Sequence, residues 1–136
     1  MYPEYLVAPM RQELVNAGFQ DLRTPEEVDQ AIKSEGTVLV MVNSVCGCAA
    51  ANARPAAKIS TSFLKHPDRF VTVFAGMEKE AVDKARAHML PFPPSSPSIA
   101  LFKDGKLVHM IERHQIEGRP AQMIADNLNQ AFDQYC

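Results

Sequence analysis

A short apolar run, Thr37–Val42, followed closely by two cysteines, constrains the fold of this chain most strongly. The run is rich in β-branched residues, which is typical of a strand that is buried on both faces of a sheet. Asn43-Ser44-Val45 leads off this strand, Cys46-Gly47-Cys48 follows, and the alanines at positions 49 to 51 favour a helix. The pattern therefore predicts two thiols, separated by one residue, where a central strand turns into a helix.

This position gives the two thiols different chemistry. The unpaired N–H groups and the dipole of a helix N-terminus stabilise an anion, and the reactive form of cysteine is the thiolate. Cys46 is therefore predicted to be the more acidic and the more exposed thiol. Gly47, which has no Cβ, is expected to let the chain fold tightly enough to bring Cys48 close. A disulfide closed over one residue is strained and easily reduced, so the pair suits a redox centre better than a structural crosslink.

Composition excludes several classes of function. The chain has 136 residues, which fits one domain spanning residues 1–136. Its net charge of -2 argues against nucleic acid or an anionic membrane as the main partner. The N-terminus shows no secretory signal pattern, and no apolar run is long enough to span a bilayer. Three cysteines without framework spacing favour a reducing, cytoplasmic location over a secreted, disulfide-stapled scaffold.

Hydrophobic spacing and capping signals predict the remaining elements. Helices are expected at 5–14, from 25 to about 36, from 49 through Leu64, at 78–89 and at 120–135. The second follows a capping box at Thr24 and Glu27, and the third should be kinked at Pro55. Strands are expected at 37–42, 69–75, 98–102 and 107–111, the last two joined as a hairpin, while 19–23 is an edge strand or a connector. The helix between the first two of these strands makes them a parallel βαβ unit.

This order of elements, with Pro97 directly before the hairpin, resembles the thioredoxin fold, an α/β fold with a central mixed sheet flanked by helices on both faces. In that fold the matching proline is cis and faces the redox cysteines, which implies the same for Pro97. The segment Asn43–Pro55, with Met1-Tyr2-Pro3 and His109–His114, is similar to the bacilliredoxin family over essentially the whole chain. Ordinary thioredoxins differ, since they carry two residues between the cysteines, commonly preceded by tryptophan, and this chain has no tryptophan.

The resemblance implies an enzyme that removes bacillithiol, a low-molecular-weight thiol, from mixed disulfides on oxidised cytoplasmic proteins. Cys46 matches the attacking cysteine of the family and Cys48 the resolving one. No metal or organic cofactor is implied, and bacillithiol acts as co-substrate, both as leaving group and as reductant. A bacillithiol-disulfide reductase is the implied downstream partner.

Four residues near the thiols are candidate substrate contacts: Ser96, Gly47, Asn52 and Arg54. A cis bond before Pro97 would set the backbone of Ser96 beside the thiols, where it would hold a client strand by main-chain hydrogen bonds. Asn52 and Arg54, a turn along the helix, are candidates for binding the carboxylates of bacillithiol, with solvated roles on the helix surface as the alternative.

Two other functions fit the same thiols. A protein disulfide isomerase or general disulfide reductase would use the same labile cysteine pair. A metal-binding or redox-sensing module without turnover would use the pair as half of a thiolate site, but the histidines are dispersed without ligand spacing, at His66, His88, His109 and His114. Zinc bound to the reduced protein would discriminate, because it would block the proposed nucleophile. Cys136 is interpreted as a bystander at a frayed end or a secondary thiolation site.

Overall fold

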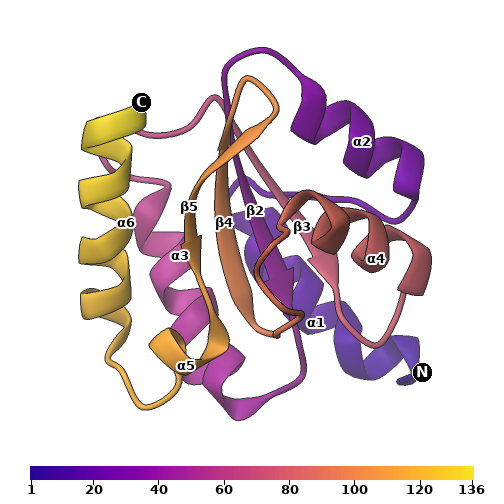
Figure 1. Ribbon diagram of the computed structural model, residues 1–136. Helices are drawn as coiled ribbons and strands as arrows, with labels where there is room; N and C mark the ends of the chain where they lie inside the picture. The colour runs from indigo at the N-terminus through magenta and orange to yellow at the C-terminus, as the bar shows by residue number, and fades with distance from the viewer.

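The computed structural model describes residues 1–136 as a five-stranded sheet covered by helices (Figure 1). The strand order is β1-β3-β2-β4-β5, in which β2 pairs parallel with β3 and antiparallel with β4. The strands are β1 (Gln20–Asp21), β2 (Thr37–Asn43), β3 (Arg69–Phe74), β4 (Ser98–Lys103) and β5 (Lys106–Ile111). The helices are α1 (Glu4–Asn16), α2 (Pro25–Lys33), the π-helical η1 (Ala49–Ala53), α3 (Arg54–Ser60), α4 (Lys79–His88), α5 (Arg113–Ile116) and α6 (Ala121–Tyr135). The mixed α/β architecture expected from the sequence is confirmed.

Strand β2 forms the centre of the sheet because both of its faces are buried. All of its residues are buried. Leu39 and Met41 point into a core shared with α1, α3 and α6. Val38, Val40 and Val42 point into a second core shared with α2 and α4. Successive side chains of a strand alternate between its faces, so the unbroken apolar run contributes side chains to both cores.

The helix after the cysteines is interrupted as expected but ends earlier than expected. The π-helical turn η1 lies directly before Pro55, which occupies the first turn of α3. A wider turn is one way in which a helix tolerates such an interruption. Helix α3 ends at Ser60, so the prediction of a helix through Leu64 is wrong, and Leu64 is fully exposed. The hydroxyls of Ser60, Thr61 and Ser62 each bond to a carbonyl three residues back, which competes with continuation of the helix.

The sequence predicts only some of the short elements at the edges of the sheet. Segment 19–23 contributes the two-residue edge strand β1, which pairs parallel with β3. The capping box at Thr24 and Glu27 is confirmed. Helix α5 was not predicted, because four residues are too few to show a helical period. The sequence feature that could have indicated this helix is a second capping box, in which the Glu112 N–H donates to the Gln115 side chain at 2.9 Å.

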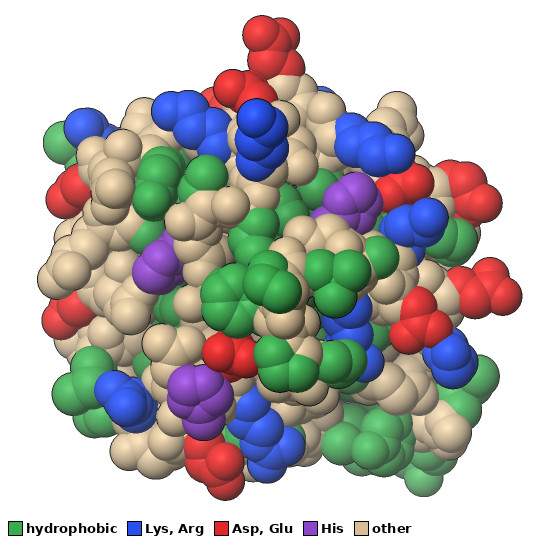
Figure 2. All heavy atoms as spheres, viewed as in Figure 1, with side chains coloured by type: hydrophobic (Ala, Val, Ile, Leu, Met, Phe, Trp, Pro, Cys, Tyr) green, Lys and Arg blue, Asp and Glu red, His purple; other side chains and the backbone are tan.

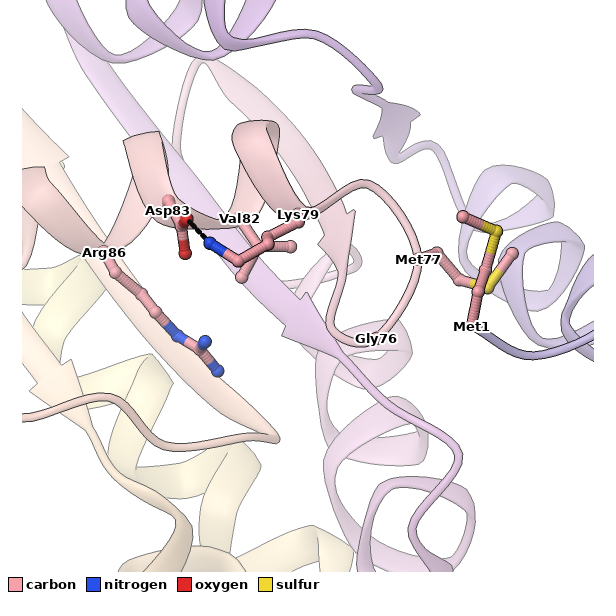
Figure 3. Close-up of a pocket in the computed structure, with 7 residues that line it drawn as sticks. All are labelled: Met1, Gly76, Met77, Lys79, Val82, Asp83 and Arg86. Carbon is pink, nitrogen blue, oxygen red and sulfur yellow. Dashed lines mark hydrogen bonds and ion pairs between the residues drawn. The ribbon is translucent and has the colours of Figure 1, made fainter.

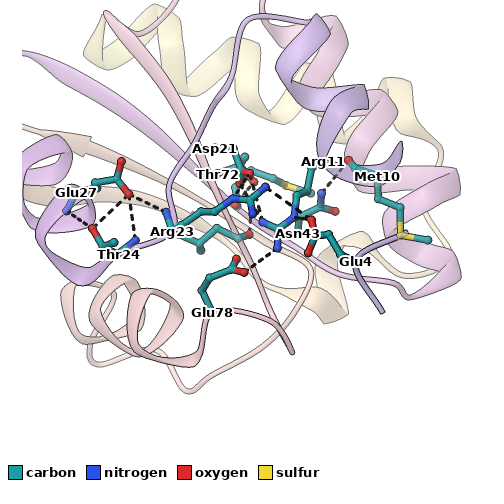
Figure 4. Close-up of polar contacts among 12 residues, drawn as sticks. Glu4, Met10, Arg11, Asp21, Arg23, Thr24, Glu27, Asn43, Thr72 and Glu78 are labelled. Atoms are coloured by element: carbon teal, nitrogen blue, oxygen red, sulfur yellow. Dashed lines mark hydrogen bonds and ion pairs between the residues drawn. The ribbon is translucent and has the colours of Figure 1, made fainter. Parts of the chain in front are cut away.

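A buried arginine fixes α1 against the sheet and against the start of α4 (Figure 4). Arg11 forms ion pairs with Glu4 at 3.2 Å, Asp21 at 3.2 Å and Glu78 at 2.8 Å. Its guanidinium also lies over the ring of Phe74, 5.2 Å from the ring centroid. The cluster therefore ties the N-terminal helix to the end of β3 and to the loop that follows it.

The segment that joins α4 to β4 crosses one face of the molecule. Figure 2 shows hydrophobic side chains gathered over this segment, in which Leu90 and Phe92 are exposed. Two of its peptide bonds are cis, Leu90–Pro91 and Ser96–Pro97. The second was expected from the fold resemblance and the first was not. No helix of the chain combines the length and the apolar character needed to cross a membrane.

Candidate active site

Cys46 lies at the turn from β2 into the helix, as predicted. Its carbonyl accepts hydrogen bonds from the N–H groups of Ala49 at 2.9 Å and Ala50 at 3.2 Å. Its own N–H donates to the Ser44 hydroxyl at 3.2 Å, which holds the turn before the helix begins. Cys46 is partly exposed and Cys48 is buried, and neither is oxidised. The prediction that Cys46 is the more exposed thiol is confirmed.

The two thiols have opposite pKa shifts. The pKa of Cys46 is lowered, chiefly by a hydrogen bond from the Cys48 thiol, while burial opposes the shift. The Cys48 N–H, 3.4 Å from the Cys46 sulfur, and the charge of Arg113 lower this pKa further. The pKa of Cys48 is raised, first by burial and then by its hydrogen bond to Cys46 and the charge there. Cys46 is therefore the more acidic thiol, as predicted, and Cys48 is a protonated donor to it.

Arg113 completes the site, although the sequence did not single it out. Its Nη2 donates to the Cys46 sulfur at 3.3 Å and its Nη1 donates to the Ser96 carbonyl at 3.3 Å. Its Nε lies 3.5 Å from a carboxylate oxygen of Glu117. One guanidinium thus joins the more acidic thiol to the loop before the hairpin.

The hairpin register was the signal that could have found Arg113. Lys103 pairs with Lys106 at the turn, and the pairing continues to Ile99 with Ile111 at the open end. Counting outward from the turn therefore sets Arg113 beside the residues just before β4.

A cavity of about 330 Å³ opens beside Cys46. Its lining residues are Tyr2, Ser44, Val45, Cys46, Ala75, Gly76, Ser96 and Arg113. The peptide bond between Ser96 and Pro97 is cis, as the fold resemblance implied. The structure therefore brings Cys46 and the loop of the cis-proline to the walls of one cavity, named the thiol cavity below.

Comparison with known proteins settles the family. A family model described as "Disulphide isomerase" matches residues 2–136. A protein named bacilliredoxin from Cytophaga hutchinsonii is 58% identical over 134 residues, covering 98% of this chain and 99% of that protein. The chain belongs to the bacilliredoxin family. A second bacilliredoxin, from Halalkalibacterium halodurans, is 55% identical over 131 residues and covers 96% of this chain and 90% of that protein.

Solved structures similar to this bacilliredoxin-family chain have the thioredoxin fold. One, described as a putative oxidoreductase with a thioredoxin fold, has a TM-score of 0.61 at 17% identity and covers 82% of this chain and 94% of that chain. A mutant thioredoxin from Halobacterium salinarum also has a TM-score of 0.61, at 18% identity, and covers 88% of this chain and 91% of that chain. The family and the cysteine pair together make this chain a thiol–disulfide oxidoreductase.

Arg54 is a structural residue, and the prediction that it contacts a ligand carboxylate is wrong. Its side chain is only 4% exposed. Its Nε donates to Glu13 at 2.9 Å, and its Nη1 donates to the Asn43 side chain at 3.0 Å and to the Ser44 carbonyl at 2.9 Å. These hydrogen bonds fix, from inside the protein, the segment that directly precedes Cys46.

Asn52 and Gly47 also differ from expectation. The Asn52 side-chain amide donates to the carbonyl of Arg119, so it ties η1 to the segment before α6 and does not line the thiol cavity. Gly47 is not among the glycines with a positive φ, and a Cβ there would meet no atom within 4 Å. The close approach of the cysteines therefore does not require a glycine, and Gly47 leaves open space beside the thiols.

None of the histidines lines the thiol cavity, and neither does the third cysteine. His66 bonds to the carbonyl of Pro67, and the other three pair with side chains, His88 with Asp29, His109 with Asn127 and His114 with Glu112. No three His, Cys, Asp or Glu side chains are grouped so that they could hold a metal ion. Cys136 is exposed, and the C-terminus lies at the opposite end of the molecule from α5 (Figure 1).

Proposed function

We propose that this chain removes bacillithiol from mixed disulfides on proteins. Cys46 supports the proposal most directly, because it is a partly exposed thiol with a lowered pKa at the wall of a cavity of about 330 Å³. Relatives that are 50% to 58% identical to the chain are named bacilliredoxins. In this proposal bacillithiol is the small thiol that enters the thiol cavity.

In the first step the Cys46 thiolate attacks the bacillithiol sulfur of the mixed disulfide. The bond between that sulfur and the client cysteine breaks, the client sulfur leaves as a thiolate and takes up a proton, and a disulfide forms between Cys46 and bacillithiol. Arg113 holds the Cys46 sulfur and the Ser96 carbonyl together. A carbonyl has two lone pairs, so Ser96 keeps one for a hydrogen bond from a client strand beside Pro97.

Two routes then release bacillithiol from Cys46. A second bacillithiol thiolate attacks the bound bacillithiol sulfur, which releases bacillithiol disulfide and the Cys46 thiolate. Alternatively, Cys48 attacks the Cys46 sulfur, which expels bacillithiol as a thiolate and leaves a Cys46–Cys48 disulfide. A bacillithiol thiolate then attacks the Cys46 sulfur of that disulfide, which frees the Cys48 thiol and returns the enzyme to the mixed disulfide that the first route resolves. Burial and the Cys46 charge both raise the pKa of Cys48 in the resting enzyme. Once Cys46 is in a disulfide its charge is gone while the charge of Arg113 still lowers that pKa, so Cys48 becomes a better nucleophile after the first step.

The cycle needs a supply of reduced bacillithiol. Each turn through the first route consumes one bacillithiol and produces one bacillithiol disulfide. A reductase of that disulfide is therefore the proposed downstream partner, and oxidised client proteins are the upstream one. Because reduced bacillithiol is required, the proposal assigns the reaction to the reducing cytoplasm, and no metal or organic cofactor takes part in it.

The test follows bacillithiol by mass spectrometry on a client protein that carries it. The wild-type chain is expected to release bacillithiol, and Cys46→Ala is expected to release none. Without free bacillithiol, Cys48→Ala should accumulate with bacillithiol attached to Cys46, since the second route is closed. A wild-type chain that leaves the client unchanged would refute the proposal.

A second function, disulfide isomerisation, is favoured by the description of the family model that matches residues 2–136. An isomerase attacks a client disulfide and needs its mixed disulfide with the client to last long enough to rearrange. Cys48 is buried, and burial still raises its pKa in the mixed disulfide, which slows the competing release. A ribonuclease with scrambled disulfides is the substrate for the test. Rearrangement of that substrate with no action on a bacillithiolated client would assign this function instead.

A further inference from the structure

A second cavity, whose lining residues Figure 3 shows, shares a wall residue with the thiol cavity. It has a volume of about 380 Å³, and its walls come from α4, from Met1 and from the loop after β3. Gly76, in that loop, lines both cavities. The two cavities therefore meet at one residue, and together they have the size of a small-molecule site.

Arg86 is the charged residue of the second cavity that lacks a partner. Lys79 donates to Asp83 at 2.6 Å, so these two charges neutralise each other. The Arg86 Nε is buried and has no hydrogen-bond partner. Figure 3 shows its guanidinium extending from α4, away from the Lys79–Asp83 pair. Arg86 is one of the residues that line this cavity, so its side chain reaches the cavity wall.

An unpaired guanidinium in this position selects a particular class of ligand. A buried donor without an acceptor is unfavourable, and a ligand that supplies the acceptor recovers that free energy. The planar fork of arginine matches the two oxygens of a carboxylate. With Lys79 and Asp83 paired, Arg86 leaves the cavity with a net positive charge. The cavity is therefore suited to an anion.

We propose that Arg86 binds a carboxylate of the low-molecular-weight thiol whose sulfur reacts at Cys46. This inference rests on the proposed function, since it names how the same co-substrate is held. The sulfur end lies in the thiol cavity, and the carboxylate end lies in the second cavity. A ligand that spans both passes Gly76, the residue that the two cavities share. Arg86 thereby distinguishes an acidic small thiol from a neutral or basic one.

The test compares two mixed disulfides on the same client cysteine, one with bacillithiol and one with cysteamine, a thiol without a carboxylate. In Arg86→Gln the ratio of kcat/KM for the bacillithiol client to that for the cysteamine client is expected to fall about tenfold, the effect of losing one charged hydrogen bond. Lys79→Arg is the control, because Lys79 lines the same cavity and the substitution keeps its positive charge beside Asp83. It should keep the wild-type ratio.

A binding measurement separates this inference from the proposed function. Titration with malate, a small dicarboxylate, should shift the Nε–H signal of Arg86 in a ¹⁵N-correlated NMR spectrum, with that signal assigned by its loss in Arg86→Gln. No bacillithiol release by the wild-type chain would refute the proposed function and, with it, this ligand. If the wild type is active, an unchanged ratio in Arg86→Gln overturns the inference alone, and so does an Nε–H signal that malate does not move.

Discussion

Replacing Arg54 with alanine removes three hydrogen bonds that hold the chain in front of Cys46. The guanidinium donates to Asn43, Ser44 and Glu13, at 3.0, 2.9 and 2.9 Å. The first two acceptors belong to buried residues, so each bond lost there costs about 1 to 1.5 kcal/mol. The Glu13 side chain is 29% exposed and keeps a second cation, so this loss costs about 0.5 kcal/mol. The free energy of unfolding should therefore fall by about 3 kcal/mol.

This loss is measurable by heat and by urea. Unfolding entropy is about 2.1 cal/mol/K per residue, so about 3 kcal/mol in a chain of 136 residues lowers Tm by about 10 °C. Urea unfolding followed by circular dichroism gives the free energy directly, and its denaturant slope should not change. Because the structure makes Arg54 a support and not a ligand contact, KM for a bacillithiolated client should stay within about twofold in the folded variant.

Lys58→Ala is the matched control. Lys58 is the other cation on Glu13, at 3.4 Å, but its side chain is 46% exposed. Its removal should change the free energy of unfolding by less than about 0.5 kcal/mol. The opposite result for Arg54→Ala, wild-type stability with a large rise in KM, would show that Arg54 contacts the ligand and would contradict this reasoning.

Three further predictions concern other positions. Arg113→Gln removes a cation that lowers the pKa of Cys46, so that pKa rises and the midpoint of iodoacetamide alkylation moves to higher pH, with a smaller move in Arg113→Lys; an unmoved midpoint in both would exclude the contact. Gly76→Val adds a Cβ against the Tyr2 ring at a φ of +89°, so urea unfolding should show a loss of about 1 to 3 kcal/mol, and full stability would contradict the geometry. Leu64→Ser changes a fully exposed residue, so its unfolding free energy should stay within about 0.5 kcal/mol, whereas a loss above about 2 kcal/mol would place Leu64 in a core.

The parts of the site that the sequence predicted correctly are those set by neighbours along the chain. The apolar run of β2 and the alanines after Cys48 fix the strand-to-helix turn, which exposes Cys46 and brings the Cys48 donors to its sulfur. The further lowering of the Cys46 pKa by Arg113 is not local to the turn. The hairpin was also predictable from neighbouring residues, because Asp104 and Gly105 mark its turn.

The parts that the sequence missed depend on partners far away in the chain. Arg113 meets Cys46 across 67 residues. The hairpin register places Arg113 beside the residues before β4 but does not show that the end of β2 lies there too. Arginine is a residue type that commonly binds ligand carboxylates, but Arg54 donates its hydrogen bond to Glu13, 41 residues earlier in the chain. Such pairings follow from packing between elements, which residue patterns within one segment do not contain.

The position of β5 in the sheet has a consequence for how the site opens. Strand β2, which leads to Cys46, is paired on both sides and buried throughout, whereas β5, which leads to Arg113, pairs only with β4 and is mostly half-buried. Central elements open only with the whole fold, and edges open locally at lower free energy. Hydrogen exchange should therefore be slowest in β2 and faster in β5. Local opening of the hairpin edge would then let the Arg113 guanidinium leave the Cys46 sulfur while the core still holds the cysteine in place.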